Sequence, residues 1–185
     1  MKKLLAIAVI LLVAAQVGYA QKPVMGVGGG IEIAMPIGNF SDVANVGFGL
    51  TGRYEYKLNK DVAITGTLGW IHWGGKNTTS YGDYGFTDIP LKGGVKYYFT
   101  PGPGRVYGMA ELGLHFTSVS WTWNAGYYGY GGSYSASETK FGFAPGVGYE
   151  MKIGKNLMLD LSGRFEIVAD VNHFALRGGI LYILP

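Results

Sequence analysis

Residues Leu157–Val168 read LMLDLSGRFEIV, and their side chains alternate between two classes. One set is apolar, as at Leu161 and Phe165, and the other is mostly polar or charged, as at Asp160 and Arg164. A period of two is typical of a β-strand with one apolar and one polar face. About ten residues is also the length of a tilted strand that crosses a bilayer. The stretch alone does not say which face is outside.

Composition points to a β-protein made of many strands. With 185 residues, the chain has room for one domain plus a short leader. Its 32 glycines, 15% aromatic residues and few prolines suit tight turns and crowded strands. The absence of cysteine excludes disulfides and thiolate chemistry. A formal net charge of +3 is too small to indicate a nucleic-acid partner.

The first twenty residues have the pattern of a signal peptide. Lys2 and Lys3 precede an apolar run from Leu4 to Val17, and small residues follow up to Ala20. This run is shorter than the roughly twenty residues of a membrane-spanning helix. We therefore expect residues 1–20 to be removed and residues 21–185 to form the mature domain. The alternative is an N-terminal anchor helix.

The remainder of the chain divides into eight segments that alternate with period two. They are Val24–Ile37, Phe48–Leu58, Val62–Trp73, Ile89–Thr100, Val106–Trp123, Phe141–Ile153, Leu157–Val168 and Phe174–Leu184.

The connections between these segments alternate in length. The short ones are turns of the Gly/Pro/Asn kind, at 59–61, 101–105 and 154–156. The others, mostly longer, are 38–47, 74–88, 124–140 and 169–173. In an up-and-down barrel this order puts all short turns at one rim and all long loops at the other. Bacterial outer-membrane barrels show this asymmetry, with periplasmic turns and extracellular loops.

Aromatic residues sort into two groups by rim, as two membrane interfaces would select. The group expected near the loop rim is Phe48, Trp70, Phe116, Phe141, Phe143 and Phe174. The group expected near the turn rim is Tyr54, Tyr56, Tyr97, Phe99, Tyr107, Tyr149 and Tyr182. A general preference of aromatics for strands is the alternative, but it does not explain sorting by rim.

The polar face is expected to lie inside the barrel. A soluble lipocalin-like barrel would have the opposite arrangement, but the loop asymmetry and the aromatic belts favour a membrane barrel. Many glycines share the charged face, and they leave space for long side chains in a narrow lumen. Buried charges must be paired, which predicts a lumen filled by ion pairs. The residues predicted for this network are Glu32, Arg53, Glu55, Lys57, Lys92, Lys96, Glu111, Glu150, Lys152, Asp160, Arg164, Glu166 and Arg177.

No catalytic, metal or cofactor signature stands out. The three histidines are scattered and have no metal-ligand spacing. His115, Ser118 and Glu111 could be drawn as a triad. In a strand, however, Ser118 lies on the opposite face from His115 and Glu111, so the geometry is poor. The glycine-rich residues 26–30 are followed by no helix, which excludes a phosphate-binding loop. We therefore expect no enzyme activity, no metal and no cofactor.

The stretch 124–137, NAGYYGYGGSYSAS, has the composition of an adaptable contact surface. Its candidate contact residues are Tyr127, Tyr128, Tyr130 and Tyr134. The alternative is a Gly/Tyr hairpin that merely extends two strands beyond the membrane.

The chain resembles the small outer-membrane β-barrel family typified by the OmpA membrane domain and OmpX. The resemblance covers the leader, the eight strands and the loop asymmetry. It includes Met35–Asp42, MPIGNFSD, which is similar to the Pro-x-Gly-x-Phe-Ser element common in that family. Many such barrels end in a Phe that the insertion machinery reads, whereas this chain ends with Leu181–Pro185.

The resemblance implies an all-β, eight-stranded antiparallel up-and-down transmembrane barrel in the outer membrane. Its implied partners are outer-membrane lipid, lipopolysaccharide and the barrel-insertion machinery, with an extracellular ligand as a further candidate. The first functional hypothesis is a non-enzymatic barrel for envelope structure or adhesion. The second is a narrow pore for small or apolar solutes, and a soluble lipocalin-like binder is the third.

Overall fold

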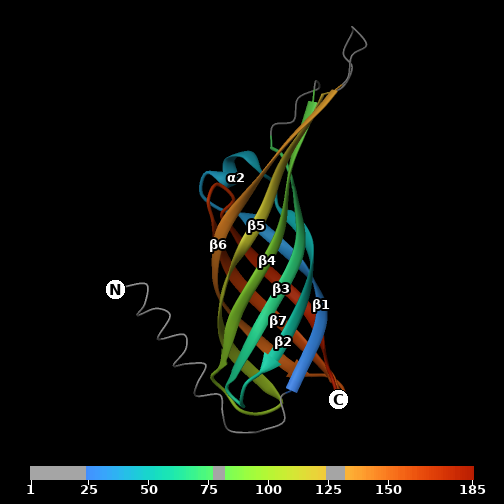
Figure 1. Ribbon diagram of the computed structural model, residues 1–185, viewed down its shortest axis with the longest axis vertical. Helices are drawn as coiled ribbons and strands as arrows, with labels where there is room; N and C mark the ends of the chain where they lie inside the picture. The colour runs from blue at the N-terminus through green and yellow to red at the C-terminus, as the bar shows by residue number, and fades with distance from the viewer. Residues whose placement is uncertain (1–23, 77–81, 124–131) are drawn as a thin grey trace, which may run out of the picture.

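A computed structural model describes residues 24–76, 82–123 and 132–185 of the chain, and its strands form a closed antiparallel barrel (Figure 1). Each strand pairs with the next along the chain, and the last pairs with the first, with Gly29 opposite Ile180. The predicted eight-stranded up-and-down barrel is confirmed. The strands are β1 (Val24–Pro36), β2 (Gly47–Lys57), β3 (Val62–Gly74), β4 (Gly82–Tyr98), β5 (Gly104–Trp123), β6 (Gly132–Lys152), β7 (Leu157–Val168) and β8 (His173–Ile183).

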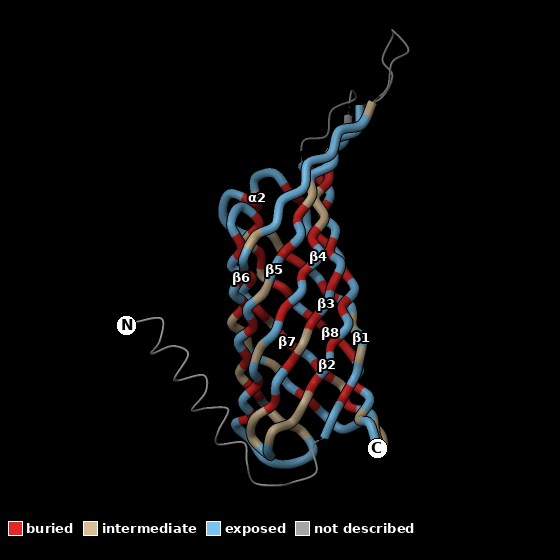
Figure 2. Tube along the Cα trace, viewed as in Figure 1, coloured by how far each residue is buried: buried red, intermediate tan, exposed pale blue. Residues whose placement is uncertain are grey.

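Buried and exposed residues alternate along every strand of the barrel wall (Figure 2). In β7, Leu161 is 45% exposed on the outside, whereas Arg164 is fully buried in the lumen. The outer surface is therefore apolar and the interior is charged, which is the arrangement of a barrel in lipid and the reverse of a soluble one.

Two strands begin well before the position that their sequence pattern predicts, by seven residues or more. β4 begins at Gly82 rather than Ile89, and β6 at Gly132 rather than Phe141. Together with the end of β5 these segments project beyond the barrel rim (Figure 1). Most side chains of β6 before Phe141 are exposed on both parities, so no apolar–polar alternation marks them as a strand.

The loop between β1 and β2 contains a one-turn helix, α2 (Phe40–Val43), that covers part of the loop rim. Gly38 turns the chain with a φ of 60°, and Ser41 donates its hydroxyl to the Gly38 carbonyl at 2.6 Å. The turn inserts Phe40 against Trp73, with ring centroids 5.4 Å apart. The Pro-x-Gly-x-Phe-Ser element thus builds this cap. Within the described ranges, no helix is both long and apolar enough to cross a membrane.

Candidate functional site: the lumen and the extracellular sheet

Asp160 of β7 is the centre of the ion-pair network in the turn-side half of the lumen. Its carboxylate lies 2.6 Å from Lys96 Nζ, 3.1 Å from Arg53 Nη1 and 2.9 Å from Arg177 Nη1. Tyr107 also donates its hydroxyl to Asp160 at 3.0 Å. One carboxylate therefore links side chains from β2, β4, β5 and β8 across the barrel.

Two further carboxylates complete the turn-side cluster. Glu55 lies 2.7 Å from Lys96 Nζ, and Glu150 lies 3.0 Å from Lys57 Nζ. Tyr98 has one hydroxyl hydrogen for two close acceptors, because its oxygen lies 2.8 Å from Glu55 and 2.7 Å from Glu150. Lys57 and Lys96 balance the two carboxylates, and every charged group in the cluster has a partner of opposite charge.

Arg164 is the centre of the loop-side half of the lumen. Its guanidinium lies 2.6 Å from Glu32 and 3.0 Å from Glu166. Lys92 forms an ion pair with Glu166 as well and lies 3.5 Å from Glu111. These side chains come from β1, β4, β5 and β7, so they meet only because the sheet closes.

His115 is oriented by a residue that the sequence analysis did not single out. Its Nδ1 lies 2.6 Å from Asp88 Oδ2, and both residues are fully buried. The partner is therefore Asp88 rather than Glu111. Ser118 is on the opposite parity of β5, so the triad drawn from the sequence does not assemble with its proposed base and orienting group.

The structure brings together all the predicted lumen residues except Lys152. That side chain lies near the end of β6 at the turn rim, where it is exposed and forms no ion pair within the described part of the chain. Its inclusion was wrong because β6 continues past the turn-side end of the lumen. Alternation still assigns Lys152 to the inward face there, but no lumen lies beside it. The network also contains residues that sequence reasoning missed, namely Asp88, Tyr98, Arg105 and Tyr107. It includes His115 as well, whose place on the inward face the sequence predicts.

Strand alternation could have identified two of these residues, Tyr98 and Tyr107, whereas Asp88 and Arg105 lie in segments predicted as connections. Tyr98 shares the inward parity of Lys96, and Tyr107 shares that of Glu111. Tyr107 was assigned to the aromatic belt at the turn rim, which is wrong: the side chain is fully buried and bound to Asp160. Its ring packs against Tyr98 with centroids 5.7 Å apart.

An apolar cluster closes the loop-side end of the lumen above the charges. Trp73 is fully buried in it and donates its indole N–H to the Ala34 carbonyl at 3.1 Å. Phe40 packs on Trp73 from outside, as described above. The cluster consists of Ala34, Phe40, Ala44, Ile71, Trp73, Val168 and Val171.

The projecting part of the molecule is a three-stranded sheet with one unpaired edge. β4 pairs with β5 up to Gly82–Trp123, and β5 pairs with β6 up to Trp123–Gly132. In contrast, the pairing of β6 with β7 reaches only to Gly142–Val168. The backbone of residues 132–141 is thus unpaired along one side in the described structure.

Aromatic side chains are exposed on this sheet. Trp121 of β5 lies opposite Tyr134 of β6, which is 66% exposed, and stacks on Tyr84 of β4 with centroids 5.9 Å apart. Of the four predicted contact tyrosines, only Tyr134 is within the described residues. Tyr127, Tyr128 and Tyr130 lie outside them.

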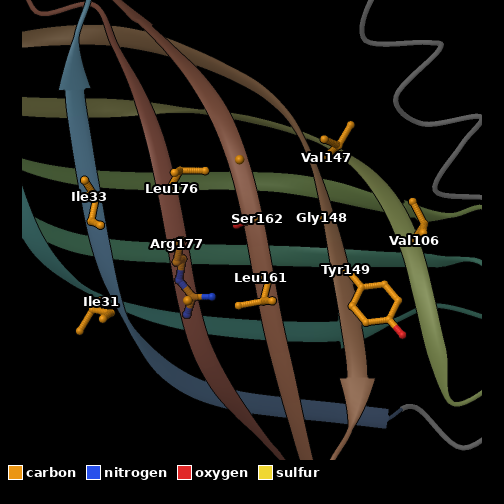
Figure 3. A pocket seen from close by; sticks show the side chains of 12 residues that line it. Ile31, Ile33, Val106, Val147, Gly148, Tyr149, Leu161, Ser162, Leu176 and Arg177 are labelled. Atoms are coloured by element: carbon orange, nitrogen blue, oxygen red, sulfur yellow. The ribbon is translucent and has the colours of Figure 1, made fainter.

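The outer barrel wall has an apolar groove that crosses several strands (Figure 3). It runs over β6, β7, β8 and β1, with Val147, Leu161 and Ile31 among its lining residues. Gly163 and Gly178 lack side chains on this outer face, and this shapes the depression. Because the groove is almost entirely apolar and faces lipid, it belongs to the membrane-contacting surface.

Known structures with the same fold support this description. The Ail protein of Yersinia pestis, solved in complex with the heparin analogue sucrose octasulfate, has a TM-score of 0.57 and 16% identity over 89% of this chain and 100% of Ail. Neisserial surface protein A has a TM-score of 0.56 and 20% identity, covering 88% and 97%. OprG of Pseudomonas aeruginosa has a TM-score of 0.60 and 12% identity, covering 87% and 95%. No curated protein sequence matches the chain.

Membership of a family follows from the sequence as a whole. The family model described as outer membrane protein beta-barrel domain matches residues 4–177, which is nearly the entire chain. Together with the lipid-facing exterior and the closed eight-stranded sheet, this match settles the location. The chain belongs to the outer-membrane β-barrel family and is a multi-pass barrel of the outer membrane.

Proposed function

We propose that this protein is a non-enzymatic, non-conducting outer-membrane barrel whose projecting sheet makes contacts at the cell surface, in adhesion or in organisation of the envelope. The observation that carries the proposal is the unpaired edge of β6 at residues 132–141, next to exposed aromatic side chains. An unpaired strand edge offers N–H and C=O groups to an extended peptide, which can add as a further strand.

The lumen supports the non-conducting half of this proposal. Its charged side chains are held in ion pairs, and the apolar cluster around Trp73 covers its loop-side end. An ion crossing the barrel would have to displace both the ion-paired side chains and the apolar cluster. A narrow pore is the competing function, and planar-bilayer recordings of the purified chain decide: we expect no conductance steps, and steady channel openings would overturn the proposal.

The partner that we propose is a segment of protein rather than a sulfated polysaccharide. The neighbour Ail was solved with a heparin analogue. In this chain, however, the described part of the projecting sheet carries Asp83, Glu138 and Lys140, and Lys140 is paired with Glu138 and Asp170, so the sheet has no basic surface there. Main-chain pairing with an extended peptide needs no such charge.

The remaining proposals concern export and insertion. Residues 1–20 are proposed to be a signal peptide removed after Ala20. The mature barrel then contacts the insertion machinery, outer-membrane lipid and lipopolysaccharide. Mass spectrometry of the protein from the outer-membrane fraction tests the cleavage, with Gln21 expected as the first residue.

Adhesion is tested with cells that display the full chain. Proline has no N–H, and the N–H groups of consecutive residues in a strand point to opposite edges. One of Ser135→Pro and Ala136→Pro therefore blocks the free edge of β6, while the other breaks a bond to β5. We expect the edge-blocking variant and Trp121→Ala/Tyr134→Ala to lower adhesion to epithelial monolayers and cell–cell aggregation.

The matched control is Phe141→Ala, which removes an exposed aromatic ring at the loop-side rim where β6 enters the barrel. All variants should keep the heat-modifiable migration of a folded barrel on gels. Wild-type adhesion by every variant would overturn the proposed role of the sheet.

A further inference from the structure

Glu32, Glu166 and His173 bring one ligand atom each to within 4.8 Å of one another in the loop-side half of the lumen. The same three side chains each carry a buried acceptor atom, namely Glu32 Oε1, Glu166 Oε2 and His173 Nε2. None of the three has a hydrogen-bond partner in the described structure. The side chains are at most 1% exposed, so water from outside does not solvate these atoms. Lone pairs gathered in this way require a positively charged or donating occupant.

Each of these groups is held in place from its other side. Glu32 Oε2 accepts from Arg164, and Glu166 Oε1 accepts from Lys92 and Arg164. His173 Nδ1 lies 2.9 Å from the Val171 carbonyl oxygen, which can only accept. Nδ1 therefore carries the hydrogen, and Nε2 presents a lone pair. This is the way in which metal-binding histidines are usually oriented.

His115 repeats this arrangement beside the same carboxylate. Its Nδ1 donates to Asp88, since a carboxylate accepts, and its Nε2 has no hydrogen-bond partner among the described residues. That Nε2 lies 4.0 Å from Glu166 Oε2. A carboxylate that orients a histidine is a recurring outer partner of metal ligands.

The charges in this half of the lumen do not balance. Four carboxylates, Glu32, Asp88, Glu111 and Glu166, lie with two cationic side chains, Lys92 and Arg164. Arg53 lies 3.6 Å from Glu111, but its closer partner is Asp160 in the turn-side cluster. The turn-side cluster has the opposite excess, so the uncompensated negative charge is local to the loop-side half.

A comparison inside the same lumen shows what an occupied carboxylate cluster looks like. Glu55, Glu150 and Asp160 also lie within ligand-binding distance of one another. There, Lys96 lies among them, and none of their oxygens lacks a hydrogen-bond partner in the described structure. In the loop-side cluster Arg164 bridges Glu32 Oε2 and Glu166 Oε1, but Glu32 Oε1, Glu166 Oε2 and His173 Nε2 have no partner among the described residues. A single water has only two hydrogens for the three acceptors, so it would leave one unsatisfied.

We propose that Glu32, Glu166 and His173, with His115 as a fourth ligand, bind a divalent first-row transition-metal ion inside the barrel. Mixed imidazole nitrogen and carboxylate oxygen ligands suit Zn²⁺, whereas Mg²⁺ and Ca²⁺ prefer oxygen alone. The bonds of about 2.0–2.2 Å that Zn²⁺ requires are reached when the side chains move inward around the ion.

A cavity of about 190 Å³ lies between the extracellular rim and this half of the lumen. Its lining includes Asp88 and Trp73 on the inner side and Glu138, Lys140 and Asp170 near the extracellular rim. Asp88 itself is fully buried, and it is bonded directly to the proposed ligand His115.

The test uses the untagged full chain, folded in detergent and freed of metal with a chelator. Co²⁺ and Zn²⁺ are titrated separately, with Co²⁺ followed by its visible absorption and Zn²⁺ by metal analysis after desalting. We expect one ion per chain, no comparable uptake of Mg²⁺, and loss of stoichiometric binding in His173→Gln and in Glu32→Gln. Asp88→Asn removes an orienting partner and should weaken binding about 10- to 100-fold.

The matched control is His72→Gln, because His72 is the outward-facing histidine and lies exposed beside Trp70. It should bind like the wild type. Each variant is compared as folded protein, selected by heat-modifiable migration. Absence of uptake by the folded wild type, or equal uptake by wild type, His173→Gln and Glu32→Gln, would overturn the proposal.

Discussion

Arg164 Nη2 lies 2.6 Å from Glu32 Oε2, and this ion pair joins β7 to β1 across the lumen with both side chains buried. Arg164→Met leaves Glu32 without its cation and removes one partner of Glu166. Breaking a buried pair costs about 3–5 kcal/mol, so we expect a loss of that order in the free energy of unfolding. Urea titration in detergent micelles, followed by Trp fluorescence, measures it.

The double variant Glu32→Gln/Arg164→Met tests whether the unpaired Glu32 carboxylate causes the loss of stability. Removing the stranded carboxylate should recover part of the lost stability. If the double variant is no more stable than Arg164→Met alone, the penalty does not come from an unpaired Glu32.

Leu161→Arg should impair insertion more severely than the lumen variant Arg164→Leu. Leu161 faces lipid in the wall of β7, and Arg on a lipid-facing position costs about 2–4 kcal/mol at the bilayer midplane. The folded fraction after insertion into lipid vesicles, read from heat-modifiable migration, measures the effect. Leu157→Arg at the turn-rim end of the strand is the control, and it should cost less because it lies nearer the interface. Equal losses of folded fraction for the Leu161 and Arg164 variants would contradict the assignment of Leu161 to the lipid face and Arg164 to the lumen.

Phe40→Ala should destabilise the barrel by about 3–5 kcal/mol, as expected for loss of a buried aromatic ring. Phe40 is 3% exposed and packs on Trp73, whereas Phe48 on the outer wall is 65% exposed. Phe48→Ala is therefore the matched control and should change stability much less. Chemical denaturation of the two variants measures the change in the free energy of unfolding. A smaller effect at Phe40 than at Phe48 would contradict the stabilising role of Phe40 in the cap.

Gly148→Ala should also be destabilising, by about 1–3 kcal/mol. A Cβ at this inward position would lie 2.3 Å from the Tyr107 ring and 2.6 Å from the Leu161 carbonyl, so Tyr107 would have to leave Asp160. Gly66→Ala is the control, because a Cβ there meets nothing within 4 Å. Thermal unfolding of both variants tests whether the interior glycines are needed for space.

Much of the barrel could be predicted from its sequence because strand alternation is a local property. The faces of Leu161 and Arg164 follow directly from period two, and closure then places the charged parity inside. The partners within the lumen could not be predicted in the same way. Whether Arg164 meets Glu32 or another carboxylate depends on the stagger between strands far apart in sequence.

The errors have physical reasons as well. The first residues of β6 were predicted as loop because both of their faces are exposed, and Lys152 was placed in the network because parity continues past the lumen. The cluster of Glu32, Glu166 and His173 gave no spacing signal, since its members come from β1, β7 and β8. Only barrel closure brings them together.

The pairing of β1 with β8 has a consequence for assembly. Glu32 lies opposite Arg177 in this pairing, and its lumen partner Arg164 comes from β7. If β1 and β8 paired with a register shifted by one residue, the charged side chains of one strand would face lipid and its apolar side chains would enter the lumen. The interior ion pairs therefore disfavour such a slip, because it would leave their charges unpaired.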